Sequence, residues 1–92
     1  MGSHIELKTQ SVPALARGLR VLEYLAQSRR GVTLSQIAQK LQMPRSTGHA
    51  LLLTCERCGY VLRDEESGRY ILSSRLHTIA RMALGGTNLR EH

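Results

Sequence analysis

The sequence is poor in aromatic residues. Its 92 residues contain three tyrosines and neither tryptophan nor phenylalanine. Proteins that bind single-stranded nucleic acid usually stack the bases on aromatic side chains. With only Tyr24, Tyr60 and Tyr70 to offer, this chain is not expected to belong to that class.

Long hydrophobic runs are also missing. No apolar stretch approaches the roughly 20 residues that a membrane-spanning helix needs, and the amino terminus has no apolar segment typical of a secretory signal. We therefore expect a cytoplasmic protein without a membrane partner. Residues 1–10 show no clear periodicity and are predicted to be a disordered amino-terminal segment or a cloning remnant.

Acidic residues are scarce beside basic ones. The chain has 13 Lys and Arg against 7 Asp and Glu, which gives a formal net charge of +6, and 11 of the 13 cations are arginine. This balance favours a polyanionic partner, and guanidinium groups suit phosphate and guanine better than ammonium groups do. Charge alone leaves open a soluble domain that is simply basic.

No residue pattern typical of an enzyme is present. Asp64, Glu65 and Glu66 are consecutive in a predicted turn, so they cannot face one another as a catalytic pair. A Ser–His–Asp grouping and a glycine-rich phosphate loop are not evident. We expect neither catalysis nor a cofactor.

The two cysteines, Cys55 and Cys58, form a C-x-x-C that invites comparison with a zinc site near His49 and His77. Structural zinc takes four ligands, commonly from two such pairs, and His49 is predicted on the opposite face of the same helix. A free cysteine on an apolar stripe behaves as a small hydrophobic residue. We expect both cysteines to pack in the core, with a redox role as the alternative and no metal.

A first helix is predicted to start at Ser11 and Pro13 and to stop before Gly31. Proline in the first turn needs no partner for an N–H group, and a basic last turn followed by glycine is typical of a helix end. Apolar residues recur at three- and four-residue spacing, which predicts a core face and a basic outer face. The core face comprises Leu15, Leu19, Leu22 and Ala26; Arg17, Arg20 and Tyr24 fall on the outer face, and Arg29 and Arg30 in the last turn.

Two short helices joined by a tight turn follow. Thr33 and Gln36 form a capping box that begins the second helix, after a very short strand at residues 32–34. Gln42 and Met43 form the turn, and Pro44 opens the third helix at its first position. The second helix packs through Leu34, Ile37, Ala38 and Leu41; the third packs through Gly48, Leu51, Cys55 and Cys58, exposes Ser46, His49, Ala50 and Leu53 with Arg45 at the edge, and stops at Gly59.

A hairpin and a fourth helix complete the pattern. Residues 60–63 and 69–72 are β-prone and flank an acidic turn at residues 64–68. Ser73 or Ser74 caps a helix that ends at Gly85 and Gly86, with an apolar face of Leu76, Ile79, Ala80 and Ala83. The fold class is mainly α with a small β-hairpin: a winged helix-turn-helix with a three-helix core and a two- to three-stranded wing.

In such a fold the second helix of the pair enters the major groove of DNA by its first turns. Here this recognition helix runs from about Pro44 to Cys58. Its unpaired N–H groups attract phosphate, its short hydroxyls donate to phosphate or base edges, and an arginine fork suits guanine. We predict that Arg45, Ser46, Thr47 and His49 contact the major groove, and that Arg17, Arg20, Arg63 and Arg69 hold phosphates.

The acidic tip of the wing would be repelled by phosphate, so the stems, with Arg63 and Arg69, are the predicted contact. An open alternative is that these arginines pair with the acids of the tip.

Five segments in this order resemble the amino-terminal domain of the IclR family of bacterial transcription regulators. The resemblance covers about residues 10–83. It implies a winged helix that binds DNA as a dimer or higher oligomer, and a linker helix at about residues 74–83. The segments are SVPALARGL (residues 11–19), LSQIA (34–38), MPRST (43–47), GYV (59–61) and GRY (68–70).

The same resemblance implies a domain organisation. We expect residues 11–73 to be the winged helix-turn-helix domain and residues 74–92 to be a linker helix and tail that lead to an effector domain absent from this sequence. An effector small molecule would act only through that domain.

Three positions depart from the family pattern. Gly48 replaces a β-branched apolar residue, Ala50 replaces a basic one, and Gln42 stands where the turn usually has glycine. Glycine inside a helix costs about 1 kcal/mol relative to alanine, which closer packing on the second helix can offset. A glutamine in a left-handed conformation is strained. These departures affect base preference rather than the fold.

The sequence therefore predicts sequence-specific binding of double-stranded DNA by a domain of a bacterial transcription regulator, acting as a symmetric dimer. The alternative is a winged-helix module that binds protein and does not contact DNA. Salt dependence separates the two, because neutralising phosphates makes affinity fall steeply with salt.

Overall fold

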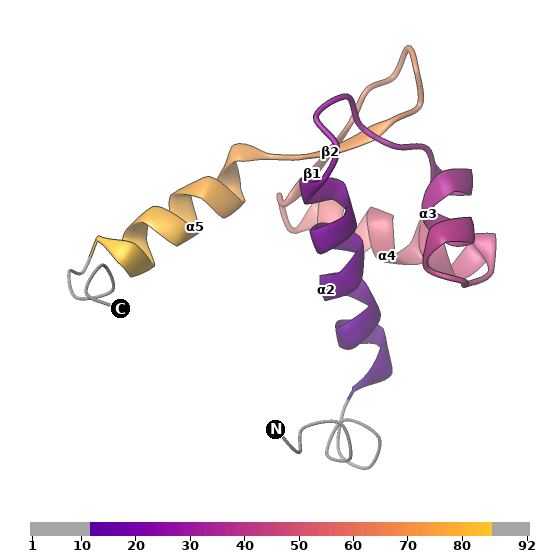
Figure 1. Cartoon of the computed structure of the whole chain (residues 1–92), viewed down its shortest axis with the longest axis horizontal. Helices are drawn as coiled ribbons and strands as arrows, with labels where there is room; N and C mark the ends of the chain where they lie inside the picture. Colours follow the sequence, from indigo (N-terminus) through magenta and orange to yellow (C-terminus); the bar gives the residue numbers. More distant parts are fainter. Residues whose placement is uncertain (1–11, 86–92) are drawn as a thin grey trace.

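The computed structural model describes residues 12–85 as a three-helix body with a β-hairpin wing and one further helix (Figure 1). The predictions for residues 1–10, Ser11 and the 86–92 tail lie outside the described residues. The order confirms a mainly α winged helix-turn-helix. The elements are α2 (Pro13–Ala26), α3 (Leu34–Lys40), α4 (Arg45–Arg57), β1 (Val61–Arg63), β2 (Tyr70–Leu72) and α5 (Ser74–Leu84).

The start of α3 is fixed by its capping box. The backbone N–H of Thr33 donates to Gln36 Oε1 at 2.8 Å, and the N–H of Gln36 donates to Thr33 Oγ1 at 3.2 Å. Both halves of the predicted box are thus confirmed. In α4, Pro44 is the N-cap residue and Arg45 is the first helical residue, one position later than predicted.

Glycines with positive φ follow two of the helices, and the one after α4 ends its helix as predicted. Gly59, at φ +90°, follows the C-cap of α4, where a left-handed residue completes the helix end. Gly31, at φ +89°, turns the chain after α2. However, α2 ends at Ala26, so Arg29 and Arg30 lie beyond the helix and not in its last turn.

The core lies where the three body helices meet the hairpin. Side chains from every one of these elements are buried in one cluster, so the wing shares the core of the helices. The cluster comprises Val21, Leu25, Val32, Ile37, Leu52, Val61 and Tyr70.

The predicted core face of α2 was right for Leu22, which packs against the core, and wrong for its other members, which are exposed. Leu15 and Leu19 are 62% and 51% exposed, whereas Val21 and Leu25 are fully buried. Tyr24, expected on the outer face, is half-buried and packs against the core. Two adjacent apolar lines run along this helix, and periodicity does not indicate which of them the other elements cover.

The packing face of α4 needs a smaller correction. Gly48 is buried as predicted, and Leu52, which the sequence analysis did not assign to this face, is fully buried as well. Cys55 packs partly against the core. Cys58 is exposed, because it caps the helix where the chain turns toward the wing, so its predicted core position was wrong.

The wing is a short antiparallel hairpin tied to the body. Val61 pairs with Leu72, and Arg63 pairs with Tyr70. Val32 adds a single bridge to Tyr70, with N···O distances of 3.1 and 2.7 Å. The strand predicted at residues 32–34 is thus reduced to one bridge, directly before the cap of α3.

The last helix, α5, leads away from the body (Figure 1). The Ser73 hydroxyl accepts from the N–H of Arg75 at 3.1 Å and donates to the carbonyl of Gly59 at 2.5 Å, so the predicted serine cap also anchors the helix start. No residue of α5 is buried. Among the described residues, none of the helices combines the length and apolarity that crossing a membrane requires.

Candidate nucleic-acid interface

The first turns of α4 present polar side chains to solvent. Arg45, Ser46 and His49 are exposed, and Thr47 is half-buried. Gly48 is buried and faces Leu34 of α3, which matches its predicted place on the packing side of the helix.

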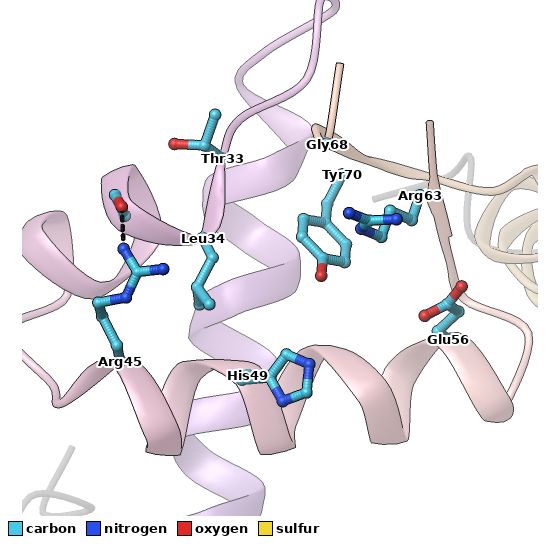
Figure 2. A pocket seen from close by; sticks show the side chains of 9 residues that line it. Thr33, Leu34, Arg45, His49, Glu56, Arg63, Gly68 and Tyr70 are labelled. Atoms are coloured by element: carbon cyan, nitrogen blue, oxygen red, sulfur yellow. Dashed lines mark hydrogen bonds between the residues drawn. The ribbon is translucent and has the colours of Figure 1, made fainter. Parts of the chain in front are cut away.

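Two of these side chains, Arg45 and His49, border a hollow between α4, the start of α3 and the wing, which we call the wing groove. Its volume is about 520 Å³. Figure 2 shows Arg45 directed from α4 toward α3, and His49 and Glu56 on the side of α4 that faces the wing, with Tyr70 pointing back toward α4. The groove is lined by Thr33, Leu34, Ser35, Arg45, His49, Glu56, Arg63, Gly68 and Tyr70.

Arg45 is held at one end of this groove. Its Nη1 donates a hydrogen bond to the hydroxyl of Ser35 at the start of α3 (Figure 2). An exposed arginine is thereby attached to the neighbouring helix. The sequence analysis placed Arg45 at the edge of the outer face but did not find this contact.

The first turns of α3 and α4 approach closely at Gly48. A Cβ added to Gly48 would lie 3.0 Å from Leu34 Cδ1 and 3.7 Å from Met43 Sδ. The side chain that is absent at this position therefore lets the two helices pack at short range, as the sequence analysis anticipated. Gln42, in the turn between them, has φ +55°, so the left-handed conformation predicted there is confirmed.

The two arginines of the wing stems differ in their surroundings. Arg63 is exposed, and its guanidinium carbon lies 5.9 Å from the centre of the Tyr70 ring, within reach of a cation–π interaction. Arg69 is half-buried, and its Nη1 donates to the carbonyl of Gly31 at 3.2 Å. Arg63 is therefore the more accessible of the two.

The acidic tip of the wing is organised by a serine. Asp64 Oδ2 accepts from the backbone N–H of Ser67 at 2.9 Å and from its hydroxyl at 2.6 Å. These two hydrogen bonds, the hydroxyl first, lower the pKa of Asp64, and the charge of Arg63 adds to the effect. The carboxylate is thus bonded mainly within its own turn, while Arg63 acts on it through charge.

The other predicted phosphate contacts, Arg17 and Arg20, are exposed on α2 outside the wing groove. The structure also adds one charged residue that the sequence analysis did not consider. Glu56 lines the groove seven residues after His49, a spacing that places both on one side of a helix. The seven-residue spacing from His49 was therefore the sequence signal that could have placed Glu56 at the groove.

A second hollow, which we call the apolar groove, lies between α2, α4 and α5. Its volume is about 560 Å³, and it contains the leucines of α2 that the core leaves exposed. Both cysteines also line it. The lining comprises Ala14, Leu15, Gly18, Leu19, Leu22, Leu51, Thr54, Cys55, Cys58, Tyr60, Leu76 and Ile79.

The cysteine pair sits in this apolar setting. Burial, and to a smaller extent the charge of Cys58, raises the pKa of the Cys55 thiol. Within residues 12–85, no three His, Cys, Asp or Glu side chains gather closely enough to share a metal ion.

Comparison with known proteins gives matches in sequence and in fold. The family model described as the IclR helix-turn-helix domain matches residues 14–65. The chain is 35% identical over 81 residues to the transcriptional repressor IclR of Escherichia coli strain K12, covering 88% of this chain and 30% of that protein. It is also 35% identical over 83 residues to a glycerol operon regulatory protein of Streptomyces coelicolor, covering 90% and 31% of the two chains.

Solved structures agree. An IclR family transcriptional regulator from Brucella abortus superimposes with a TM-score of 0.78 at 30% identity, covering 99% of this chain and 35% of the other. A regulator from Alicyclobacillus acidocaldarius gives 0.70 at 36% identity, covering 78% and 30%. The chain thus spans about a third of the length of these relatives.

Proposed function

Because the chain belongs to the IclR family of transcription regulators, as the family match over residues 14–65 and the 35% identical relatives show, we propose that it binds duplex DNA sequence-specifically through α4 and the wing. The observation that carries the proposal is the wing groove. It joins the exposed start of the second helix of the pair to an arginine of the wing, the two elements with which a winged helix-turn-helix contacts DNA.

In the proposed complex α4 enters the major groove. The exposed Arg45 and His49 face base edges, and Ser46 and Thr47, on the first turn, donate to phosphate or bases. The N–H groups at the start of α4 have no side-chain cap, so they remain available to a phosphate.

Four arginines supply the phosphate contacts. Arg17 and Arg20 lie exposed on α2, and Arg63 stands on the wing. Arg69 uses one N–H on the Gly31 carbonyl, but a guanidinium has five donors, so others remain for DNA.

We propose further that two copies act together and that the chain is the DNA-binding part of a longer regulator. Leu15 and Leu19 of α2 and Ile79 of α5 line the apolar groove and are exposed there. A second copy that packs there would cover these side chains and create the two-fold symmetry that a palindromic site requires. Residues 11–73 would then be the DNA-binding domain, with α5 as the link to an effector domain, in a protein that acts on bacterial DNA in the cytoplasm.

Salt dependence tests duplex binding against the alternative of a protein-interaction module. Each neutralised phosphate contributes a slope of about −0.9 to log affinity against log salt. Four phosphate contacts per domain predict a slope of about −3 to −4, and Arg17→Ala should reduce its magnitude by about one. Absence of duplex binding by the folded, dimer-competent chain at low salt would favour the alternative.

Base contact by Arg45 makes a sharper prediction. Arg45→Ala should cost about 1–3 kcal/mol on a duplex selected from a random pool, and less on random duplex, because the lost bidentate contact discriminates between bases. Arg57→Ala is the matched control, since Arg57 is also exposed on α4 but lies outside the wing groove. Gel-shift titrations that showed an equal loss on both duplexes would contradict base contact by Arg45.

A further inference from the structure

The contact between Arg45 and Ser35 joins the two helices at the end of the wing groove. Arg45 is the first residue of α4 and Ser35 the second residue of α3, and the guanidinium donates to the serine hydroxyl (Figure 2). An exposed arginine otherwise samples many rotamers and loses side-chain entropy when it is ordered. Here one end of the guanidinium is attached to a neighbouring element.

The serine is available because another residue caps its helix. The Thr33 side chain accepts from the N–H of Gln36, so the first turn of α3 does not depend on the Ser35 hydroxyl. Ser35 is exposed and faces the wing groove. Its hydroxyl oxygen is thus left for a contact outside α3.

The short distance between α3 and α4 allows the contact between Ser35 and Arg45. Gly48 lets Leu34, the neighbour of Ser35, approach α4 to the point where a Cβ at position 48 would lie only 3.0 Å away. This approach places the first turn of α3 beside the first turn of α4. A serine, whose side chain is short, reaches Arg45 because the helices are this close.

We propose that Ser35 is a positioning residue, which presets the guanidinium of Arg45 for contact with a base. This inference rests on the proposed function. The serine oxygen takes one N–H, and the four remaining donors of the guanidinium stay available to DNA. Because the side chain is ordered before binding, less conformational entropy is lost in the complex, and the orientation of the fork favours one base edge over others.

The opposite role would give the opposite result. If the hydrogen bond to Ser35 kept Arg45 away from DNA, its removal would tighten binding. Reduced base discrimination in Ser35→Ala would therefore support the positioning role, and tighter binding would support the opposite role.

The first test uses the free chain. In nitrogen-15 relaxation measurements, the Arg45 Nε–H group should be ordered in the wild type, become mobile in Ser35→Ala, and regain order in Ser35→Thr, which restores a hydroxyl. Gln39→Ala is the control, since Gln39 is exposed on the same helix but lies outside the wing groove. Wild-type order at Arg45 in Ser35→Ala would overturn the positioning role without affecting the proposal of DNA binding.

The second test uses the duplex that the wild-type chain selects from a random pool, together with single-base variants of it. Ser35→Ala should reduce discrimination by about two- to tenfold, the size of one net hydrogen bond, only at the base pair whose readout Arg45→Ala relaxes. Ser35→Thr should restore it, and affinity for random duplex should stay unchanged.

Unchanged discrimination, uniform weakening at every base pair or tighter binding would each overturn the positioning role. Selection that enriches no sequence would overturn base readout itself, and with it this role of Ser35.

Discussion

At the scale of the residue, Gly48 shows how a missing side chain determines the spacing of two helices. Glycine within a helix costs about 1 kcal/mol relative to alanine. A Cβ at Gly48 would lie 3.0 Å from Leu34 Cδ1, closer than side chains normally pack. Glycine here therefore lowers the helix propensity of α4 but allows closer packing against α3. Packing thus accounts for a glycine at this position.

A pair of substitutions tests this account. Gly18→Ala should raise the free energy of unfolding by about 0.5–1 kcal/mol, because its Cβ would meet only Leu51 Cδ2, at 4.0 Å. Gly48→Ala should raise it by less or lower it, since Leu34 must move to accept the methyl group. Urea unfolding of the three chains measures the difference. A gain at Gly48 as large as that at Gly18 would show that Gly48 is not needed for close packing.

At the scale of the element, the wing is held by hydrogen bonds within its turn and by the bridge to Val32. Asp64 accepts from the N–H and the hydroxyl of Ser67, and the N–H of Gly68 donates to the Asp64 carbonyl at 2.8 Å. The carboxylate is stabilised in its charged form, which is the cause of its lowered pKa.

This carboxylate gives the wing a defined dependence on pH. Since folding lowers the pKa of Asp64 below its usual 3.8, the stabilisation is present above the pKa of the unfolded chain and is lost as the pH falls through the folded pKa. Carboxyl carbon NMR should give a midpoint below 3.8 for Asp64. In Ser67→Ala the midpoint should rise only part of the way, because the backbone N–H still donates.

Ser74→Ala is the control for that titration. Ser74 begins α5 and makes no hydrogen bond to Asp64 among the described residues. A midpoint in Ser67→Ala equal to the wild-type value would mean that the hydroxyl is not what lowers the pKa of Asp64.

The elements themselves were largely predictable, because their ends depend on local chemistry. The capping box at Thr33, the glycine stop at Gly59 and the order of hairpin and helices follow from residues a few positions apart. The buried face of α2 did not follow, since Leu15 and Val21 are both apolar and only the neighbouring elements decide which is covered.

The candidate site was predictable in part for the same reason. The exposure of Arg45, Ser46 and His49 follows from helical spacing. The hydrogen bond from Arg45 to Ser35 links residues ten positions apart, and it depends on how closely two helices pack. The periodicity of the sequence does not predict the distance between the two helices.

At the scale of the whole molecule, α2 exposes apolar side chains that the rest of the described chain does not cover. Leu15, Leu19 and Ile79 are apolar, exposed and gathered on one groove. Because exposed apolar patches often serve association, this surface supports the proposed dimer. The error in the predicted core face and the proposed dimer thus concern the same side chains.

Leu19→Arg tests the association. A buried, unpaired charge in the interface should shift the chain from dimer to monomer in sedimentation velocity and weaken binding to a palindromic duplex more than to a half-site. Leu62→Arg is the matched control, since Leu62 on the wing is 52% exposed, against 51% for Leu19, and lies outside the apolar groove. A dimer that persisted in Leu19→Arg and dissociated in Leu62→Arg would place the interface elsewhere.

The bridge from Val32 to Tyr70 has a consequence for the duplex that the proposed complex could accept. It fastens the wing one residue before the cap of α3, and Tyr70 and Val61 also lie in the core that the helices share. The wing and α4 therefore share one core and are held at a fixed spacing. In the proposed complex, a duplex would have to present its major groove and its flanking backbone at this fixed spacing. Sequence changes that alter groove width or bendability would then carry a deformation cost even at base pairs that no side chain contacts.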